Sequence, residues 1–222
     1  MNKETAASVS APEETYEVLD SGVIHQTSYK KIDYNYDYSN KYNNYGEKGN
    51  YLGYLRLGTL IGAIKEIPQR ILDVGYGNGA FMAAACTLIP HVAGCDLSPY
   101  PVPEGCHRVE SLTDAAYDVV TFFDSLEHFD DISIIRALKC RYIFISVPWC
   151  HATDPSTPAF LNWYHRRPNE HLWHFNKESL VAFFAECGYK PVIEGLAVED
   201  AVRKNAAVAP QPNILTALFA RT

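Results

Sequence analysis

One short segment constrains the fold of this chain more than any other: Ile71-Leu-Asp-Val-Gly-Tyr-Gly-Asn-Gly-Ala-Phe81. It begins as a short apolar strand, passes through three alternating glycines and continues into an apolar helical pattern that Pro90 ends. Glycines at a strand-to-helix turn let the backbone take positive φ and let a ligand approach closely. The following helix offers unpaired N–H groups and the positive end of its dipole. The segment therefore predicts an α/β fold with a ligand site at this turn.

Apolar runs and helical spacings alternate along most of the chain, which favours a mostly parallel sheet covered by helices. The runs at 117–123 and 141–147 are apolar throughout, as in central parallel strands. Three prolines between 99 and 103 forbid a regular helix between the second and third strands, so this crossover is predicted to be a loop. We expect strands at 70–75, 91–96, 107–110, 117–123, 141–147, 193–198 and 214–220, and helices at 51–67, about 80–88, 131–139 and 177–187.

Composition limits the class of protein. The chain has 222 residues, 47% hydrophobic, which is enough for one large domain with a packed core. A net charge of −7 disfavours a general electrostatic grip on nucleic acid. No apolar run approaches the roughly 18 residues of a membrane span, and residues 1–16 do not resemble a secretory signal. The six cysteines lack C-x-x-C spacing, so we expect reduced thiols and a cytoplasmic location.

Two carboxylates indicate which ligand the glycine turn would take. Asp73 lies two residues before the first glycine, where it would repel a pyrophosphate and attract an ammonium group. Asp96 ends the next predicted strand and is placed to accept hydrogen bonds from ribose hydroxyls. A ligand with a ribose, a cationic centre and an amino acid end fits this pair better than a dinucleotide does. A tight structural turn without a ligand remains the alternative.

The chain resembles class I S-adenosylmethionine-dependent methyltransferases over residues 51–222. Besides the glycine turn, three stretches carry the resemblance: Asp124-Ser-Leu-Glu-His128, Ser146-Val-Pro-Trp149, and His171-Leu-Trp-His-Phe-Asn through Gly188. The last two are similar to the ubiquinone-biosynthesis-like branch of that family. The resemblance implies a Rossmann-like, doubly wound sheet of seven strands with an antiparallel last strand. It also implies S-adenosylmethionine as cofactor and methyl transfer to an O, N or C atom of a small-molecule acceptor.

The resemblance also implies roles for individual residues. Asp73 would support the ammonium group of the cofactor, Asp96 would bind its ribose, and Leu97 would lie against its adenine. Positions 110–112, at the end of the third strand, would contribute to the adenine pocket. The remaining predicted cofactor contacts are Gly75, Tyr76, Gly77 and Gly79 in the turn, and Asp124 and Ser125 after the fourth strand.

Methyl transfer needs an aligned acceptor and, for a protic acceptor, a route for its proton. The candidate bases are His128, His151, His165, His171 and His174, of which His128 and His151 are the favoured catalytic residues. Trp149 and His171 are predicted to contact the acceptor. His171 and His174, three residues apart, could form a metal pair, but related methyltransferases without metals carry similar residues. No metal is therefore expected.

The tyrosines are unevenly distributed: eight of the 15 lie between Tyr29 and Tyr54. We expect a disordered tail at 1–20, a Tyr-rich arm or lid at 21–50 and the methyltransferase domain at 51–222. Tyrosine combines a flat apolar face with a hydroxyl group, so the arm is predicted to line the acceptor site. An oligomer contact, as in a homodimer, and a flexible arm are the alternatives. The arm's predicted acceptor contacts are Tyr34, Tyr38, Tyr42 and Tyr45.

Three other functions compete with this interpretation. A methyltransferase that modifies a nucleotide or nucleic acid base is disfavoured because segments like D-P-P-Y and P-C-Q are absent. A nicotinamide-dependent oxidoreductase is disfavoured by Asp73. An inactive scaffold that keeps the fold is disfavoured by the intact glycines and by both carboxylates.

Overall fold

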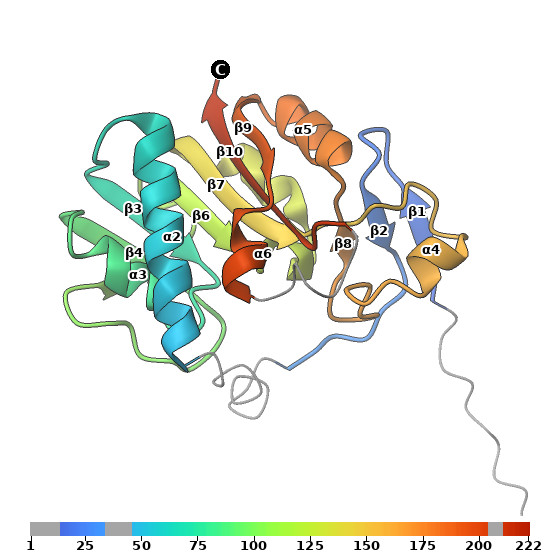
Figure 1. Cartoon of the computed structure of the whole chain (residues 1–222), viewed down its shortest axis with the longest axis horizontal. Helices are drawn as coiled ribbons and strands as arrows, with labels where there is room; N and C mark the ends of the chain where they lie inside the picture. Colours follow the sequence, from blue (N-terminus) through green and yellow to red (C-terminus); the bar gives the residue numbers. More distant parts are fainter. Residues whose placement is uncertain (1–13, 34–45, 204–210) are drawn as a thin grey trace, which may run out of the picture.

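The computed structural model describes residues 14–33, 46–203 and 211–222. A seven-stranded sheet in the order β5-β4-β3-β6-β7-β10-β9 forms its centre (Figure 1). Strands β5, β4, β3, β6 and β7 pair in parallel, whereas β10 is antiparallel to both β7 and β9. The predicted Rossmann-like sheet with an antiparallel last strand is confirmed. The strands are β3 (Arg70–Val74), β4 (His91–Cys95), β5 (His107–Arg108), β6 (Tyr117–Phe123), β7 (Cys140–Pro148), β9 (Tyr189–Leu196) and β10 (Ile214–Arg221).

Two helices cover one face of this sheet: α2 (Gly46–Ile64) and α3 (Ala80–Ala85). Leu60 of α2 and Phe81 of α3 are both buried in the same apolar cluster. Gly53 permits the close approach of the two helices, because a Cβ atom at this position would lie 2.4 Å from the carbonyl oxygen of Ala80. This contact fixes the start of α3, and with it the glycine turn, against the carboxyl edge of the sheet.

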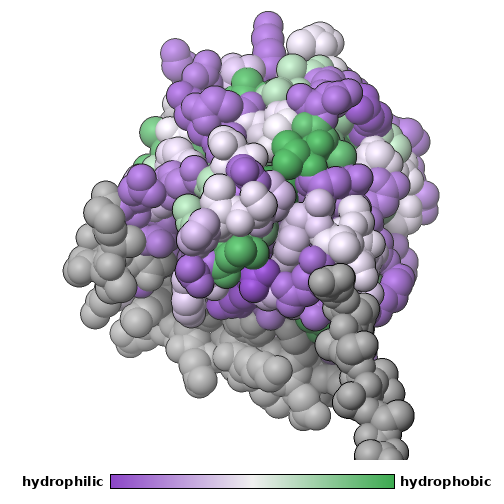
Figure 2. Space-filling model, turned by 90° about the vertical axis from the view of Figure 1, so that its right-hand side faces the viewer, coloured by the Kyte–Doolittle hydropathy of each residue, from purple (hydrophilic) through white to green (hydrophobic). Residues whose placement is uncertain are grey.

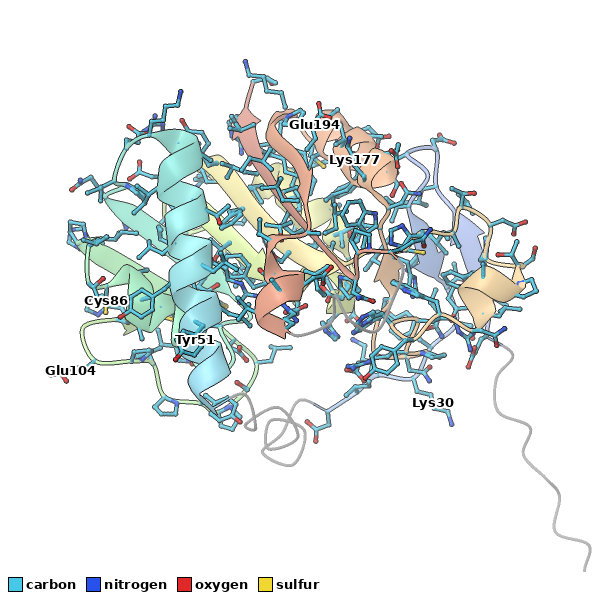
Figure 3. All side chains as sticks on the ribbon, viewed as in Figure 1. Lys30, Tyr51, Cys86, Glu104, Lys177 and Glu194 are labelled. Carbon is cyan, nitrogen blue, oxygen red and sulfur yellow. The ribbon has the colours of Figure 1, made fainter. Side chains whose placement is uncertain are left out.

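The opposite face carries η3 (Ile132–Ala137), a 3-10 helix, and α5 (Lys177–Glu186). Their apolar side chains join those of β6, β7 and β10 in the larger core cluster. Helix α5 begins with a capping box, in which the Asn176 side chain accepts from the Ser179 N–H at 2.7 Å. On the surface, Lys177 and Glu194 of β9 point toward each other at 3.5 Å (Figure 3).

A small three-stranded sheet lies beside the large one. It consists of β1 (Tyr16–Val18), β2 (Ile24–Gln26) and β8 (Trp173–His174), with α4 (Pro158–Leu161) packed next to it. The Tyr16 ring meets the Phe160 ring edge-on at 5.0 Å. This end of the molecule is mostly hydrophilic with small separate hydrophobic patches (Figure 2). Strand β1 falls within the segment 1–20 that was expected to be a disordered tail, while residues 1–13 lie outside the described part.

Several element boundaries differ from the prediction. Helix α2 starts five residues earlier than predicted, at Gly46, and the predicted helix at 131–139 is the 3-10 helix η3. The predicted strand at 193–198 starts earlier, at Tyr189, and its end is occupied by a further helix, α6 (Val198–Arg203). As the prolines predicted, the crossover between β4 and β5 contains no helix. Within the described ranges, no helix has both the length and the hydropathy that crossing a bilayer requires.

Candidate active site

A cavity of about 1000 Å³ opens at the carboxyl ends of β3, β4 and β6. This is the edge where open parallel sheets bind their ligands. Its wall also includes side chains from α2, from α6 and from the segment before β8. Among the predicted cofactor residues, the cavity is lined by Asp73, Gly75, Tyr76, Gly77, Asp96, Leu97, Asp124 and Ser125.

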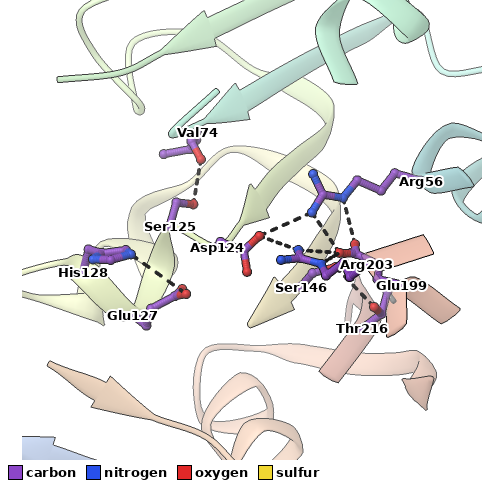
Figure 4. Close-up of polar contacts among 10 residues, drawn as sticks. All are labelled: Arg56, Val74, Asp124, Ser125, Glu127, His128, Ser146, Glu199, Arg203 and Thr216. Atoms are coloured by element: carbon purple, nitrogen blue, oxygen red, sulfur yellow. Dashed lines mark hydrogen bonds and ion pairs between the residues drawn. The ribbon is translucent and has the colours of Figure 1, made fainter. Parts of the chain in front are cut away.

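The glycine turn is shaped by a contact with the segment after β6. Gly75 has a φ of 73°, and a Cβ atom on it would lie 2.5 Å from the Cβ atom of Ser125. The Ser125 hydroxyl donates to the Val74 carbonyl at 2.7 Å (Figure 4). Only glycine fits here without displacing one of the two segments. Gly79, by contrast, is not part of the cavity wall. It packs against Pro103, because a Cβ atom on Gly79 would lie 2.7 Å from the Cγ atom of that proline.

Asp73 is buried at the base of the cavity, with 2% of its surface exposed. Its Oδ1 accepts a hydrogen bond from the Thr121 hydroxyl at 2.7 Å. Burial raises the pKa of this carboxyl to about 6, although Thr121 and the Arg56 guanidinium act in the opposite direction. A cationic ligand beside Asp73 would stabilise the ionised carboxylate and would itself be held by it.

Asp96 is held by two backbone N–H groups. Its Oδ2 accepts from Gly77 at 2.7 Å, and its Oδ1 accepts from Ser98 at 2.6 Å. Two carboxylate oxygens offer about four lone-pair sites, so both can still accept hydrogen bonds from a diol. The neighbouring Leu97 is 82% exposed and borders the cavity, as does Leu112 from the predicted adenine pocket.

A network of buried charges closes the cavity between α2 and α6 (Figure 4). Arg56 donates to both oxygens of Glu199, at 2.7 and 2.9 Å. Arg203 donates to Glu199 at 2.6 Å and to Asp124 at 2.5 Å, and Ser146 donates to Glu199 at 2.6 Å. Burial alone would raise the pKa of Glu199, but the two arginines lower it to about 2. The ion pair with Arg203 fixes Asp124, which has a φ of 51°, at the cavity wall.

This network was missed at the sequence level. Glu199 and Arg203 are four residues apart on α6, which would have been a recognisable helical ion pair. The predicted strand at 193–198 concealed that spacing. Arg56 lies within the predicted helix at 51–67, 143 positions before Glu199, so no spacing in the sequence connected the two residues.

Two histidines of the cavity wall are held by backbone carbonyls. His128, in the 3-10 helix η2 (Leu126–His128), has its Nδ1 2.8 Å from the Glu170 carbonyl oxygen. The Nδ1 of His171 lies 2.7 Å from the His165 carbonyl oxygen. Burial lowers the pKa of His128, and burial together with His128 lowers the pKa of His171 to about 2. Both rings are therefore neutral at pH 7.

Glu127 lies beside these rings, with 1% of its surface exposed. Burial, reinforced by the Asp124 carboxylate, raises the pKa of Glu127 well above its usual range. One ligand atom each from Glu127, His128 and His171 lie within 4.8 Å of one another, which is compatible with a shared metal ion. The pair weighed from the sequence, His171 and His174, differs from this group. Both ring nitrogens of His174 instead lie near backbone carbonyl oxygens. Its Nδ1 is 3.3 Å from that of Ile24, and its Nε2 is 3.1 Å from that of Arg166.

Two predicted site residues lie away from the cavity. His151 follows β7, but its Nε2 is 2.7 Å from the Pro212 carbonyl oxygen and its surface is exposed. Its ring stacks on that of Trp149, with 5.4 Å between the centroids. Neither residue is part of the cavity wall. The chain after β7 turns toward the segment before β10, and this turn could not be deduced from the order of elements.

The described part of the Tyr-rich arm reaches the cavity. Tyr29 donates to Asp130 at 3.0 Å, and Lys31 pairs with the same carboxylate at 2.6 Å. Tyr29, Lys31 and Ile32 line the cavity from one side, and Leu52 of α2 lines it from another. The predicted acceptor contacts Tyr34, Tyr38, Tyr42 and Tyr45 lie outside the described residues.

A family model for a methyltransferase domain matches residues 45–194, which include the glycine turn, Asp96 and the segment after β6. The chain belongs to this methyltransferase family. The predictions of a transferase and of a class I S-adenosylmethionine-dependent methyltransferase are confirmed. The match does not single out the ubiquinone-biosynthesis-like branch. No curated protein matches the chain.

Solved structures resemble the chain in fold. Magnesium protoporphyrin IX methyltransferase (ChlM) from Synechocystis PCC 6803, with bound SAH, has a TM-score of 0.53 at 14% identity, covering 81% of this chain and 88% of that one. The plantazolicin methyltransferase BpumL, in complex with a monoazolic desmethylPZN analog and SAH, has a TM-score of 0.54 at 14% identity, covering 84% and 89%. A putative S-adenosylmethionine-dependent methyltransferase from Listeria monocytogenes has a TM-score of 0.51 at 15% identity, covering 76% and 98%.

Proposed function

We propose that this methyltransferase transfers the methyl group of S-adenosylmethionine to a small-molecule acceptor bound in the same cavity. One observation carries the proposal: a single cavity of about 1000 Å³ joins the glycine turn to the wall formed by His128 and His171. Small-molecule sites commonly measure about 300–1,000 Å³. The volume is therefore sufficient for a cofactor and a small acceptor side by side.

The residues divide this cavity into two ends. At the cofactor end, Asp73 holds the ammonium group, Asp96 holds the ribose and Leu97 covers the adenine. At the other end, His128, His171 and the start of the Tyr-rich arm surround the acceptor. The sulfonium is already a strong electrophile, so catalysis consists mainly of aligning the acceptor atom, the methyl group and the sulfur.

The related structures support an acceptor of this class. The plantazolicin methyltransferase was solved with a desmethylPZN analog, and ChlM acts on magnesium protoporphyrin IX. The net charge of −7 of the present chain fits a small acceptor better than a nucleic acid.

Calorimetry with S-adenosylhomocysteine tests the cofactor assignment. We expect micromolar binding by the wild type and no response to NAD. Asp96→Ala should weaken binding by about 1–3 kcal/mol, because the ribose hydroxyls lose their acceptor. Glu194→Ala, at an exposed surface pair, should bind like the wild type. A wild-type dissociation constant for Asp96→Ala would refute the ribose role, and binding of NAD alone would refute methyl transfer.

The acceptor end is tested with a labelled methyl donor and a panel of small molecules that carry hydroxyl, amine or activated carbon groups. Label should appear in a small-molecule product. If labelled RNA or DNA were the only product, the nucleic acid alternative would replace this proposal. If cofactor bound without any transfer, the inactive scaffold would replace it.

A further inference from the structure

Glu127, His128 and His171 form a cluster that methyl transfer itself does not require. Glu127 and His128 come from the 3-10 helix η2 after β6, whereas His171 comes from the segment before β8. One ligand atom from each residue lies within 4.8 Å of the others. All three side chains line the cavity.

The carboxylate of this cluster is almost completely buried. Glu127 is 1% exposed, and neither of its oxygens has a hydrogen-bond partner in another residue of the described part of the chain. The Nε2 atom of His128 lies 4.0 Å from its Oε1 atom (Figure 4). Burying a carboxyl group without partners costs several kcal/mol, so this arrangement fits a group that accepts a ligand.

The two imidazoles are oriented as metal ligands usually are. The Nδ1 atoms of His128 and His171 lie 2.8 and 2.7 Å from the carbonyl oxygens of Glu170 and His165. A carbonyl only accepts, so each Nδ1 carries the proton and the lone pair of a neutral ring is on Nε2. Metal-binding histidines typically donate their second ring N–H to a carbonyl or carboxylate in this way.

We propose that Glu127, His128 and His171 bind a divalent transition-metal ion at the acceptor end of the cavity. Two imidazoles and one carboxylate form a ligand set that suits such ions and leaves coordination positions open. Because the three residues line the cavity, the open positions face the acceptor. This site departs from the sequence-based expectation that no metal is present.

The site also specifies the acceptor, and this part rests on the proposed function. A divalent ion lowers the pKa of a hydroxyl group that it contacts, so the acceptor atom is an oxygen. The hydroxyl proton passes to solvent, and the oxygen forms a bond to the methyl carbon. The bond from carbon to sulfur breaks, and its electron pair returns to sulfur to give neutral S-adenosylhomocysteine.

Metal binding is tested on the chelated, dialysed full-length protein by titration with Co²⁺, followed by visible absorption and calorimetry, with Mn²⁺, Zn²⁺ and Mg²⁺ for comparison. We expect one Co²⁺ per chain, with micromolar or tighter affinity. Glu127→Gln and His171→Ala should each weaken it at least tenfold. His91→Ala, an exposed histidine at the start of β4, should leave it unchanged.

Circular dichroism of the same variants shows whether they are folded, and S-adenosylhomocysteine binding shows whether the cofactor site is intact. Absence of Co²⁺ binding by the folded wild type, or wild-type Co²⁺ binding by both cluster variants, would overturn the metal site while leaving the proposed function in place. Co²⁺ binding without S-adenosylhomocysteine binding would retain the site and refute the proposed function. Chelation should lower transfer to hydroxyl acceptors at least tenfold, and label found only on nitrogen or carbon would overturn the oxygen assignment.

Discussion

Three buried carboxyl groups in or beside the cavity differ in how far neighbouring groups compensate their negative charge. Asp73, Glu127 and Glu199 are all buried, yet their surroundings differ. Two arginines compensate Glu199, a single hydroxyl and a more remote guanidinium partly compensate Asp73, and Glu127 lacks a hydrogen-bond partner in other described residues. The pKa of Glu199 is therefore lowered, whereas the pKa values of Asp73 and Glu127 are raised. The two carboxyls with raised pKa values are the ones for which we propose cationic ligands.

Replacing Asp73 with asparagine should stabilise the free protein at pH 7.5 and weaken cofactor binding. Burial raises the pKa of Asp73 from 3.8 to about 6, so the folded state binds more protons than the unfolded state in that interval. The free energy of unfolding therefore falls by about 3 kcal/mol as the pH rises from 3.8 to about 6. Asparagine avoids this loss and still accepts from Thr121. Thermal unfolding should show a higher Tm for Asp73→Asn at pH 7.5 and little difference near pH 4.

Cofactor affinity should follow the same ionisation in the opposite sense. The ammonium group prefers the ionised carboxylate, so S-adenosylhomocysteine should bind the wild type more tightly at pH 7.5 than at pH 5. Asp73→Asn should show a much flatter profile, measured by calorimetry across this range. An unchanged pH profile in the variant would show that Asp73 does not hold the ammonium group.

At the scale of elements, α6 is attached to the site by ions rather than by apolar packing. Its Glu199 joins α2 through Arg56 and β7 through Ser146, and its Arg203 joins the turn after β6 through Asp124. Burial alone would lower the pKa of Arg203, but Asp124 and Glu199 raise it above its usual range. The position of α6 therefore depends on Glu199, on the Arg203–Asp124 pair, and on Asp200, which accepts from the Asn213 N–H at 2.9 Å.

Glu199→Ala should destabilise the protein by about 3–5 kcal/mol, because it removes the carboxylate closest to the largely buried guanidinium group of Arg56 and leaves Arg56 and Arg203 with Asp124 alone to share. Chemical denaturation measures this loss directly. Glu194→Ala, which removes an exposed carboxylate only five residues away, should change the unfolding free energy by less than about 0.5 kcal/mol. Equal effects of the two substitutions would show that the buried network does not hold α6.

At the scale of the whole molecule, the cavity is bounded by parts of the chain that are far apart in sequence. The described residues on both sides of the segment 34–45 border it: Tyr29, Lys31 and Ile32 before the segment, and Leu52 and Arg56 after it. The parts of the chain before and after this segment therefore both contribute to the cavity wall. This placement keeps the predicted role of the arm in acceptor binding as a hypothesis that can be tested.

Limited proteolysis tests the arm. We predict that saturating S-adenosylhomocysteine slows tryptic cleavage after Lys41, because a ligand in the cavity gives the arm a surface to contact. In Asp96→Ala, the same concentration of ligand should protect less, in proportion to its weaker binding. Cleavage at the same rate with and without ligand would argue against a lid.

The sequence by itself determined the parts of this protein that depend on local chemistry. The resemblance to the methyltransferase family came from the glycine turn together with Asp73, Asp96 and the stretches at 124–128, 146–149 and 171–188. The glycines from Gly75 to Gly79 and the apolar runs of β6 and β7 predicted the sheet and its ligand edge, and the prolines predicted the loop between β4 and β5. Each of these features acts within a few residues of the chain, through allowed φ angles, side-chain periodicity or the missing N–H of proline.

Only the tertiary structure decided which distant residues share the cavity. Arg56 meets Glu199 across 143 positions, His171 joins Glu127 from another segment, and His151 and Trp149 turn away toward the residues before β10. Such meetings depend on how helices and loops pack over the sheet, since neither periodicity nor spacing records the direction of a loop after it leaves a strand. The sequence therefore predicted which residues surround the glycine turn and singled out His128 and His171, but only the tertiary structure brought these histidines together with Glu127 in one cavity.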